Sequence, residues 1–99
     1  MSRIDRYTIQ RCVLRDTTAP EGVMFILDID DGAIIPQAVA FLCPCGCGIE
    51  IYLPVDGSNV ETKWSLSLND GTPTITPSVA MRGGCMSHYF ITRGEVRWC

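Results

Sequence analysis

The sequence lacks the features that mark several large classes of protein. None of its apolar runs approaches the roughly 20 residues that a membrane-spanning helix needs, so we expect no contact with a membrane. The N-terminal segment carries Arg3, Asp5 and Arg6 where a secretory signal peptide has an apolar stretch, which favours the cytoplasm. The chain also has no block of lysine or arginine, and its formal net charge is -3. The basic surface of a nucleic-acid-binding protein is therefore missing.

Helical periodicity is missing as well. No stretch of about a dozen residues keeps an apolar period of 3.6 residues, whereas alternating segments and turn dipeptides recur along the chain. A chain of 99 residues is enough for one compact domain and too short for two. We predict a single mainly β domain over residues 1–99, built as a small, mostly antiparallel sheet or a partly open barrel.

Alternation and turn signals predict where the strands lie. The expected strands fall within residues 6–14, 22–30, 38–43, 49–55, 63–79 and 88–99, with a turn at Asp70-Gly71 dividing the fifth segment in two. In residues 22–30, one face of the strand carries Val23, Phe25, Leu27 and Ile29. Pro73 and Pro77 predict that the strand carrying them is irregular or lies at a sheet edge, because proline cannot donate to a ladder.

The last of these segments predicts a hairpin in detail. A two-residue turn at Arg93-Gly94 pairs Tyr89 with Trp98 and places His88 opposite Cys99. His88 and Cys99 would then lie on the face of the hairpin that points away from its core side.

Cysteine, in contrast, is abundant. Six cysteines in 99 residues is a high content for a cytoplasmic chain, where clustered thiols more often bind metal or carry out redox chemistry than form disulfides. The segment "CPCGCG" (43–48) supplies one short-spaced cluster and "CMSH" (85–88) supplies another. Two such clusters, each on a tight turn and separated by a few dozen residues, are typical of a tetrahedral zinc site.

More donors are present than a tetrahedral zinc ion needs. The six candidate metal ligands are Cys43, Cys45, Cys47, Cys85, His88 and Cys99. The clusters favour Cys85 and His88 together with two of the three cysteines in 43–47, with Cys99 in reserve; Cys12 lies outside every cluster. Four protein ligands leave no position for water, which predicts a structural zinc (Zn2+) site. The alternatives are redox or disulfide chemistry, unliganded packed thiols, and a thiol nucleophile with His88 as its base.

Three segments resemble the hallmark segments of a family of small prokaryotic and phage proteins with no assigned activity. They are "FLCPCGCGIEIYLPV", "WSLSLNDGTPTITPSV" and "CMSHYFITRGEVRW", and they span roughly residues 40–98. The resemblance implies that the cysteines of both clusters and His88 occupy metal-binding positions, and that the chain comes from a phage or another mobile element. Some members look like accessory genes beside ubiquitin-like conjugation or defence systems. The resemblance implies nothing for Cys99, which follows the last segment.

These observations lead to an expected function. We expect a non-enzymatic, zinc-stabilised protein-interaction module, an accessory protein of a phage or mobile element that binds a protein partner or a larger assembly and no nucleic acid. Its expected location is the cytoplasm of a bacterial host or a virion. A minor structural component of a virion is one alternative. A zinc-assisted hydrolase is the other, with Glu50 or Asp70 as general base.

Overall fold

The structure is a computed structural model that describes residues 3–12, 18–27, 37–55, 63–69, 71–81 and 85–99. These residues form strands and no helix: β1 (Thr8–Cys12), β2 (Val23–Leu27), β3 (Ala38–Leu42), β4 (Glu50–Pro54), β5 (Ser65–Asn69), β6 (Thr72–Ala80), β7 (His88–Thr92) and β8 (Glu95–Trp98). The prediction of a mainly β protein is confirmed. Within the described part of the chain, no helix is long and apolar enough to span a membrane.

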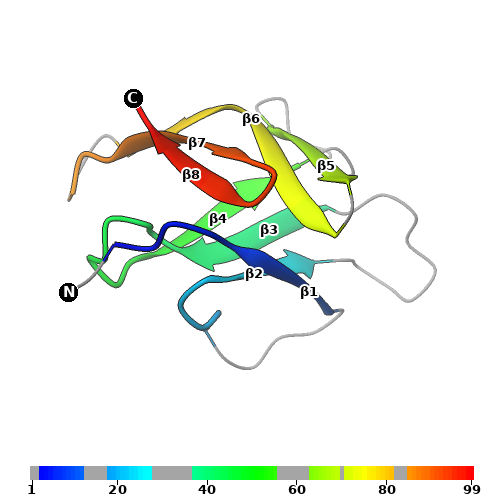
Figure 1. Ribbon diagram of the computed structural model, residues 1–99. Coiled ribbons are helices and arrows are strands. Elements are labelled where there is room, and N and C mark those ends of the chain that lie inside the picture. Colours follow the sequence, from blue (N-terminus) through cyan, green and yellow to red (C-terminus); the bar gives the residue numbers. More distant parts are fainter. Residues whose placement is uncertain (1–2, 13–17, 28–36, 56–62, 70, 82–84) are drawn as a thin grey trace.

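The strands form two sheets that lie one above the other (Figure 1). One sheet has the order β1-β2-β3-β4 and the other the order β5-β6-β7-β8. The ladders are antiparallel except that of β1 with β2, which is parallel. The expected single sheet or partly open barrel is therefore a pair of packed sheets that do not close into a barrel.

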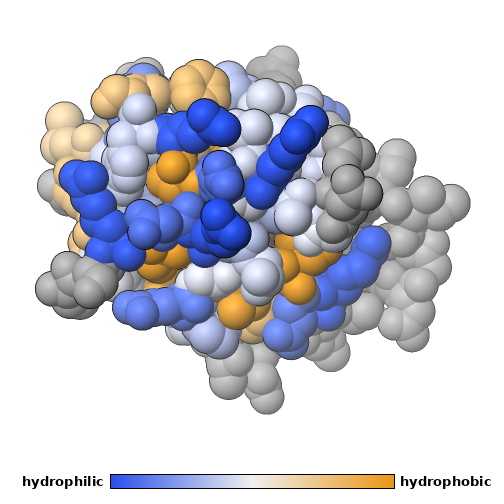
Figure 2. Space-filling view, in the orientation of Figure 1, coloured by the Kyte–Doolittle hydropathy of each residue, from blue (hydrophilic) through white to orange (hydrophobic). Residues whose placement is uncertain are grey.

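The main core fills the space between the two sheets. Alternate residues of β3, β4, β6 and β7 point inward, because successive side chains of a strand lie on opposite faces. The buried side chains include Val39, Phe41, Ile51, Leu53, Ile75, Val79, Tyr89 and Ile91. On the side of the molecule shown in Figure 2, hydrophilic side chains separate several smaller hydrophobic areas.

Strand β2 is buried on both faces. Met24 and Ile26 turn toward the main core, whereas Phe25 belongs to a smaller cluster with Ala19 and Ala40. The face that alternation assigned to Val23, Phe25 and Leu27 is thus the face of this smaller cluster, while Ile29 lies outside the described residues. The opposite face, with Met24 and Ile26, supplies the main core.

The last hairpin has the predicted register. Tyr89 lies opposite Trp98, and the ladder continues to the turn at Arg93-Gly94. Both turn residues have positive φ, 50° for Arg93 and 80° for Gly94, which is typical of the turn that matches the twist of a two-residue hairpin. Beyond the ladder, the Cys99 amide donates to the His88 carbonyl at 3.1 Å, so these two residues lie side by side as expected.

The N-terminal segment links the two sheets. The Tyr7 amide donates to the Gly94 carbonyl at 2.7 Å, and the next residue begins β1 of the other sheet. The Tyr7 hydroxyl donates to the carbonyl of Leu42, at the end of β3. Residues 4–7 thereby tie the tip of the last hairpin to the end of β3.

Strand β6 differs from the expectation in one respect. It lies between β5 and β7 rather than at a sheet edge, despite Pro73 and Pro77. The expected irregularity is present, because the register with β7 jumps from Ile75↔Ile91 to Val79↔Tyr89. The jump contains Pro77, so the missing N–H falls where the regular ladder is interrupted.

Candidate functional site

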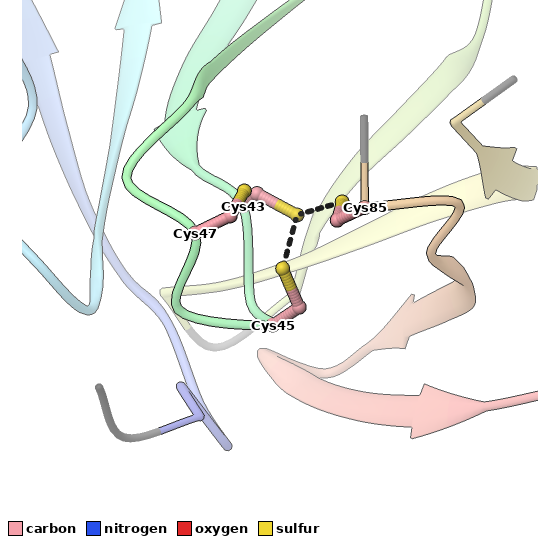
Figure 3. A group of neighbouring side chains, drawn as sticks. All are labelled: Cys43, Cys45, Cys47 and Cys85. Atoms are coloured by element: carbon pink, nitrogen blue, oxygen red, sulfur yellow. Dashed lines mark hydrogen bonds between the residues drawn. The ribbon is translucent and has the colours of Figure 1, made fainter. Parts of the chain in front are cut away.

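Four cysteine thiols meet at one end of the molecule. Cys43, Cys45 and Cys47 lie on the loop from β3 to β4, and Cys85 lies just before β7 (Figure 3). Their four Sγ atoms all lie within 4.8 Å of one another. The Cys43 sulfur is 3.5 Å from that of Cys45 and 3.6 Å from that of Cys85. These separations are too long for disulfides and close to the roughly 3.8 Å between sulfurs on a tetrahedral zinc ion.

The β3–β4 loop holds its thiols by folding tightly. The Cys43 amide donates to the Ile49 carbonyl at 2.8 Å, which closes the loop, and the Gly46 amide donates to the Cys43 carbonyl at 3.2 Å inside it. Gly46 and Gly48 have φ values of 90° and 85°, which glycine adopts without strain. The sequence thus bends sharply enough for alternate cysteines to point toward one centre.

The thiols differ in their electrostatic surroundings. Burial raises the pKa of the Cys43 thiol to about 12. The Ser87 hydroxyl, 3.1 Å from the Cys85 sulfur, lowers the pKa of that thiol to about 6. Ser87 is itself buried, and its hydroxyl is 3.8 Å from the Cys43 sulfur. A set of four thiols with such a hydroxyl beside it fits a soft or borderline metal ion such as zinc.

His88 and Cys99 lie outside this thiol group. The structure brings together Cys43, Cys45, Cys47 and Cys85 of the six candidate ligands, whereas Cys99 is exposed at the end of the hairpin. The His88 ring points to the outer face of its sheet, because the next residue, Tyr89, is buried on the inner face.

The His88 ring contacts a serine on the neighbouring strand. Ser78 Oγ lies 2.8 Å from His88 Nε2, within hydrogen-bonding distance. Ser78 is half-buried and His88 is exposed, so the pair lies at the surface. A serine hydroxyl hydrogen-bonded to an imidazole is the arrangement in which histidine activates a serine nucleophile. Spacing along the chain does not predict this pair, because the two residues meet only through the pairing of β6 with β7.

Glu50 and Asp70 were the general bases expected for a zinc-assisted hydrolase. The Glu50 carboxylate accepts a hydrogen bond from the Ala19 amide at 3.1 Å. Asp70 lies outside the described residues, as does the side chain of Cys12. Ser87 was not among the candidate site residues, although its position between Cys85 and His88 is a signal for it in the sequence.

The comparisons with known proteins give one result. A family model described as "Bacterial ubiquitination-like system serine protease (BubE)" matches residues 12–99. No curated protein and no solved structure matches the chain.

This match corrects the expected function. The family's description names a protease, so the interpretation as a non-enzymatic interaction module is wrong. It names a bacterial system, so it agrees with the resemblance to small prokaryotic proteins and not with a phage or virion role. The alternative of a zinc-assisted hydrolase is not supported either, since the family's description names a serine protease. Because the match covers 88 of 99 residues, the chain belongs to the BubE family, described as the serine protease of a bacterial ubiquitination-like system.

Proposed function

We propose that this protein is a serine protease in which Ser78 is the nucleophile and His88 the general base. The observation that carries the proposal is the 2.8 Å contact between Ser78 Oγ and His88 Nε2. A serine nucleophile needs an adjacent base, and His88 is the only histidine of the chain. The family's description supplies the reaction class, and the contact supports the choice of residues.

The other described serines fit the role less well. The Ser87 hydroxyl is buried and lies against two thiols, so substrate has no access to it. Ser65 and Ser67 are on β5, and β6 separates that strand from β7, which carries His88. Ser78 combines partial exposure with the imidazole contact.

The reaction follows from this geometry. Ser78 Oγ attacks the carbonyl carbon of the scissile amide while His88 Nε2 takes the hydroxyl proton, which requires the tautomer with its proton on Nδ1. The resulting imidazolium gives that proton to the leaving amine, and the C–N bond breaks to leave a Ser78 ester. Water then attacks the ester with His88 again as base, releasing the acid and restoring the serine.

We place the substrate among ubiquitin-like proteins. The family's description places it in a bacterial ubiquitination-like system, so the proposed scissile bond is an amide of a ubiquitin-like protein. The pair lies on the outer face of the second sheet, a position that a polypeptide can reach. The proposed protein partner is therefore the substrate itself.

The proposal includes a structural zinc ion on Cys43, Cys45, Cys47 and Cys85. Four thiolates would fill its coordination sphere, so the metal would act on the fold and not on the substrate. Cys85 lies three residues before His88, and between them the Ser87 carbonyl accepts the Met81 amide at 2.7 Å. The metal would thus hold the segment from which β7 presents His88 to Ser78.

The test is the replacement Ser78→Ala, with Ser67→Ala as control because Ser67 is an exposed serine in the same sheet. The substrate is a ubiquitin-like protein of a bacterial ubiquitination-like system fused to a C-terminal tag, and tag release is followed by mass spectrometry. We expect Ser78→Ala to lower the rate at least about a thousandfold, as loss of a nucleophile does. A fluorophosphonate probe should label residue 78 of the parent protein. Cleavage by Ser78→Ala at the parent rate would refute the assignment.

A further inference from the structure

Ser78 lies in an interruption of the sheet. On β6, the residues between Ile75 and Val79 are 76, 77 and 78, whereas on β7 the partners Ile91 and Tyr89 have only Phe90 between them. Three residues of one strand thus stand opposite one residue of the other. Such bulges redirect a side chain, at the cost of the regular hydrogen bonds that hold a strand.

The pairing of β6 with β5 also ends before Ser78. The last pair of that ladder is Ser65↔Thr76, and residue 77 is a proline, which has no N–H to offer. Ser78 therefore lies inside the interruption of the ladder with β7 and beyond the last pair of the ladder with β5. The Ser78 backbone therefore needs a hydrogen bond from elsewhere to keep one orientation.

Trp64 provides this contact. Its indole Nε1–H donates to the Ser78 carbonyl at 3.3 Å. The Trp64 amide in turn donates to the Pro54 carbonyl at 2.9 Å, at the end of β4 in the other sheet. The half-buried indole also packs against the main core. The group that contacts the Ser78 backbone is thus anchored to both sheets.

We infer that Trp64 is a positioning residue for the nucleophile, an inference that rests on the proposed role of Ser78. Its N–H holds the carbonyl of residue 78, and this fixes the peptide plane and the direction of the Cα–Cβ bond from which Oγ reaches His88. Without the N–H the bulge has more than one orientation open to it, and the 2.8 Å contact is populated for less of the time. A misplacement of about 1 Å in a reacting group can cost a hundredfold in rate.

The first test is Trp64→Phe, which removes the N–H and keeps an aromatic ring. The matched control is Trp98→Phe, because Trp98, on β8, is also a half-buried tryptophan and packs edge-on against Tyr89. We expect kcat, and the rate of fluorophosphonate labelling at residue 78, to fall about tenfold in Trp64→Phe with little change in KM. Trp98→Phe should retain both. Equal rates in Trp64→Phe and the parent protein would overturn the inference.

A second measurement does not depend on turnover. The 15N signal of His88 Nε2 reports its hydrogen bond, and we expect Trp64→Phe to move it toward its position in Ser78→Ala. If it keeps the parent position, Trp64 does not position the serine. If Ser78→Ala cleaves normally while Trp64→Phe still moves the signal, the proposed function fails and the positioning role stands.

A third variant tests the inference if Trp64→Phe does not fold. Benzothienylalanine at position 64 replaces the indole N–H by sulfur and keeps the shape of the ring system. The same loss of rate and the same shift of the His88 signal are expected with it, and parent behaviour in both would overturn the inference.

Discussion

At the scale of single residues, Ser87 changes the pKa of a neighbouring thiol. Its hydroxyl lies 3.1 Å from the Cys85 sulfur, and this contact lowers the pKa of Cys85, whereas burial raises the pKa of Cys43. In the metal-free protein near neutral pH, we therefore expect Cys85 to be ionised and Cys43 to be protonated. We expect Cys85 to bind an incoming metal ion first, because thiolates and not thiols bind metal.

This difference predicts the order of alkylation in metal-free protein. Iodoacetamide reacts with thiolates, so Cys85 should reach half its maximal rate near its pKa of about 6, while Cys43 stays slow up to pH 9. Peptide mapping after short pulses between pH 5 and pH 9 measures both rates. Ser87→Ala should move the Cys85 profile to higher pH, because the lowering contact is gone. An unchanged profile in Ser87→Ala would show that the hydroxyl does not tune the thiol.

At the scale of elements, the turn between β7 and β8 also contacts the N-terminal segment. Gly94 has a φ of 80°, and a Cβ at this position would lie 2.7 Å from the Tyr7 carbonyl oxygen. The tip of the hairpin therefore admits the N-terminal segment only because residue 94 has no side chain. Gly71 has a similar φ of 76°, but a Cβ there would meet nothing within 4 Å.

The two glycines form a matched pair for mutation. Gly71→Ala introduces only the strain of a positive φ, about 1–2 kcal/mol. Gly94→Ala adds the collision with the Tyr7 backbone, so we expect a loss of more than about 2 kcal/mol. Since 1 kcal/mol corresponds to about 4–8 °C for a domain of this size, the melting temperature of Gly94→Ala should be clearly the lower of the two. Equal melting temperatures would show that the N-terminal segment does not need this close approach.

At the scale of the whole molecule, the thiol group connects the two sheets. Three of its cysteines belong to the loop between β3 and β4 of the first sheet, and Cys85 leads into β7 of the second. A metal ion bound there would join sheets that otherwise meet through the core and the N-terminal segment. Metal binding of this kind contributes directly to folding in small domains, whose cores are limited.

Removal of one ligand should therefore affect the entire fold. We expect about one zinc per chain in the parent protein, and in Cys85→Ser a loss of zinc together with a fall in melting temperature of more than about 10 °C. Elemental mass spectrometry and thermal unfolding measure the two. Cys99→Ser and His88→Gln serve as controls that should keep the zinc. Loss of zinc from either control would place that residue among the ligands.

Much of the fold was predictable from local pattern. The register of the last hairpin followed from Arg93-Gly94 and alternation, and it brought His88 beside Cys99 as expected. The spacing of "CPCGCG" and "CMSH" put the four cysteines that converge among the six candidate ligands, but it favoured His88 over one of the three cysteines in 43–47. The orientation of β2 was harder to assign, because Met24, Phe25 and Ile26 are all buried, and alternation cannot decide between two apolar faces.

The sequence by itself determined the class of the fold, the thiol-rich segments and the hairpin, because each depends on residues close together in the chain. Only the tertiary structure decided which side chain His88 contacts. Its proximity to cysteines made it a candidate metal ligand, whereas the pairing of β6 with β7 and the bulge around Pro77 place its ring against Ser78. The physical reason is that spacing along the chain sets which residues share a turn, but the alternation of strand faces sets which side chains meet.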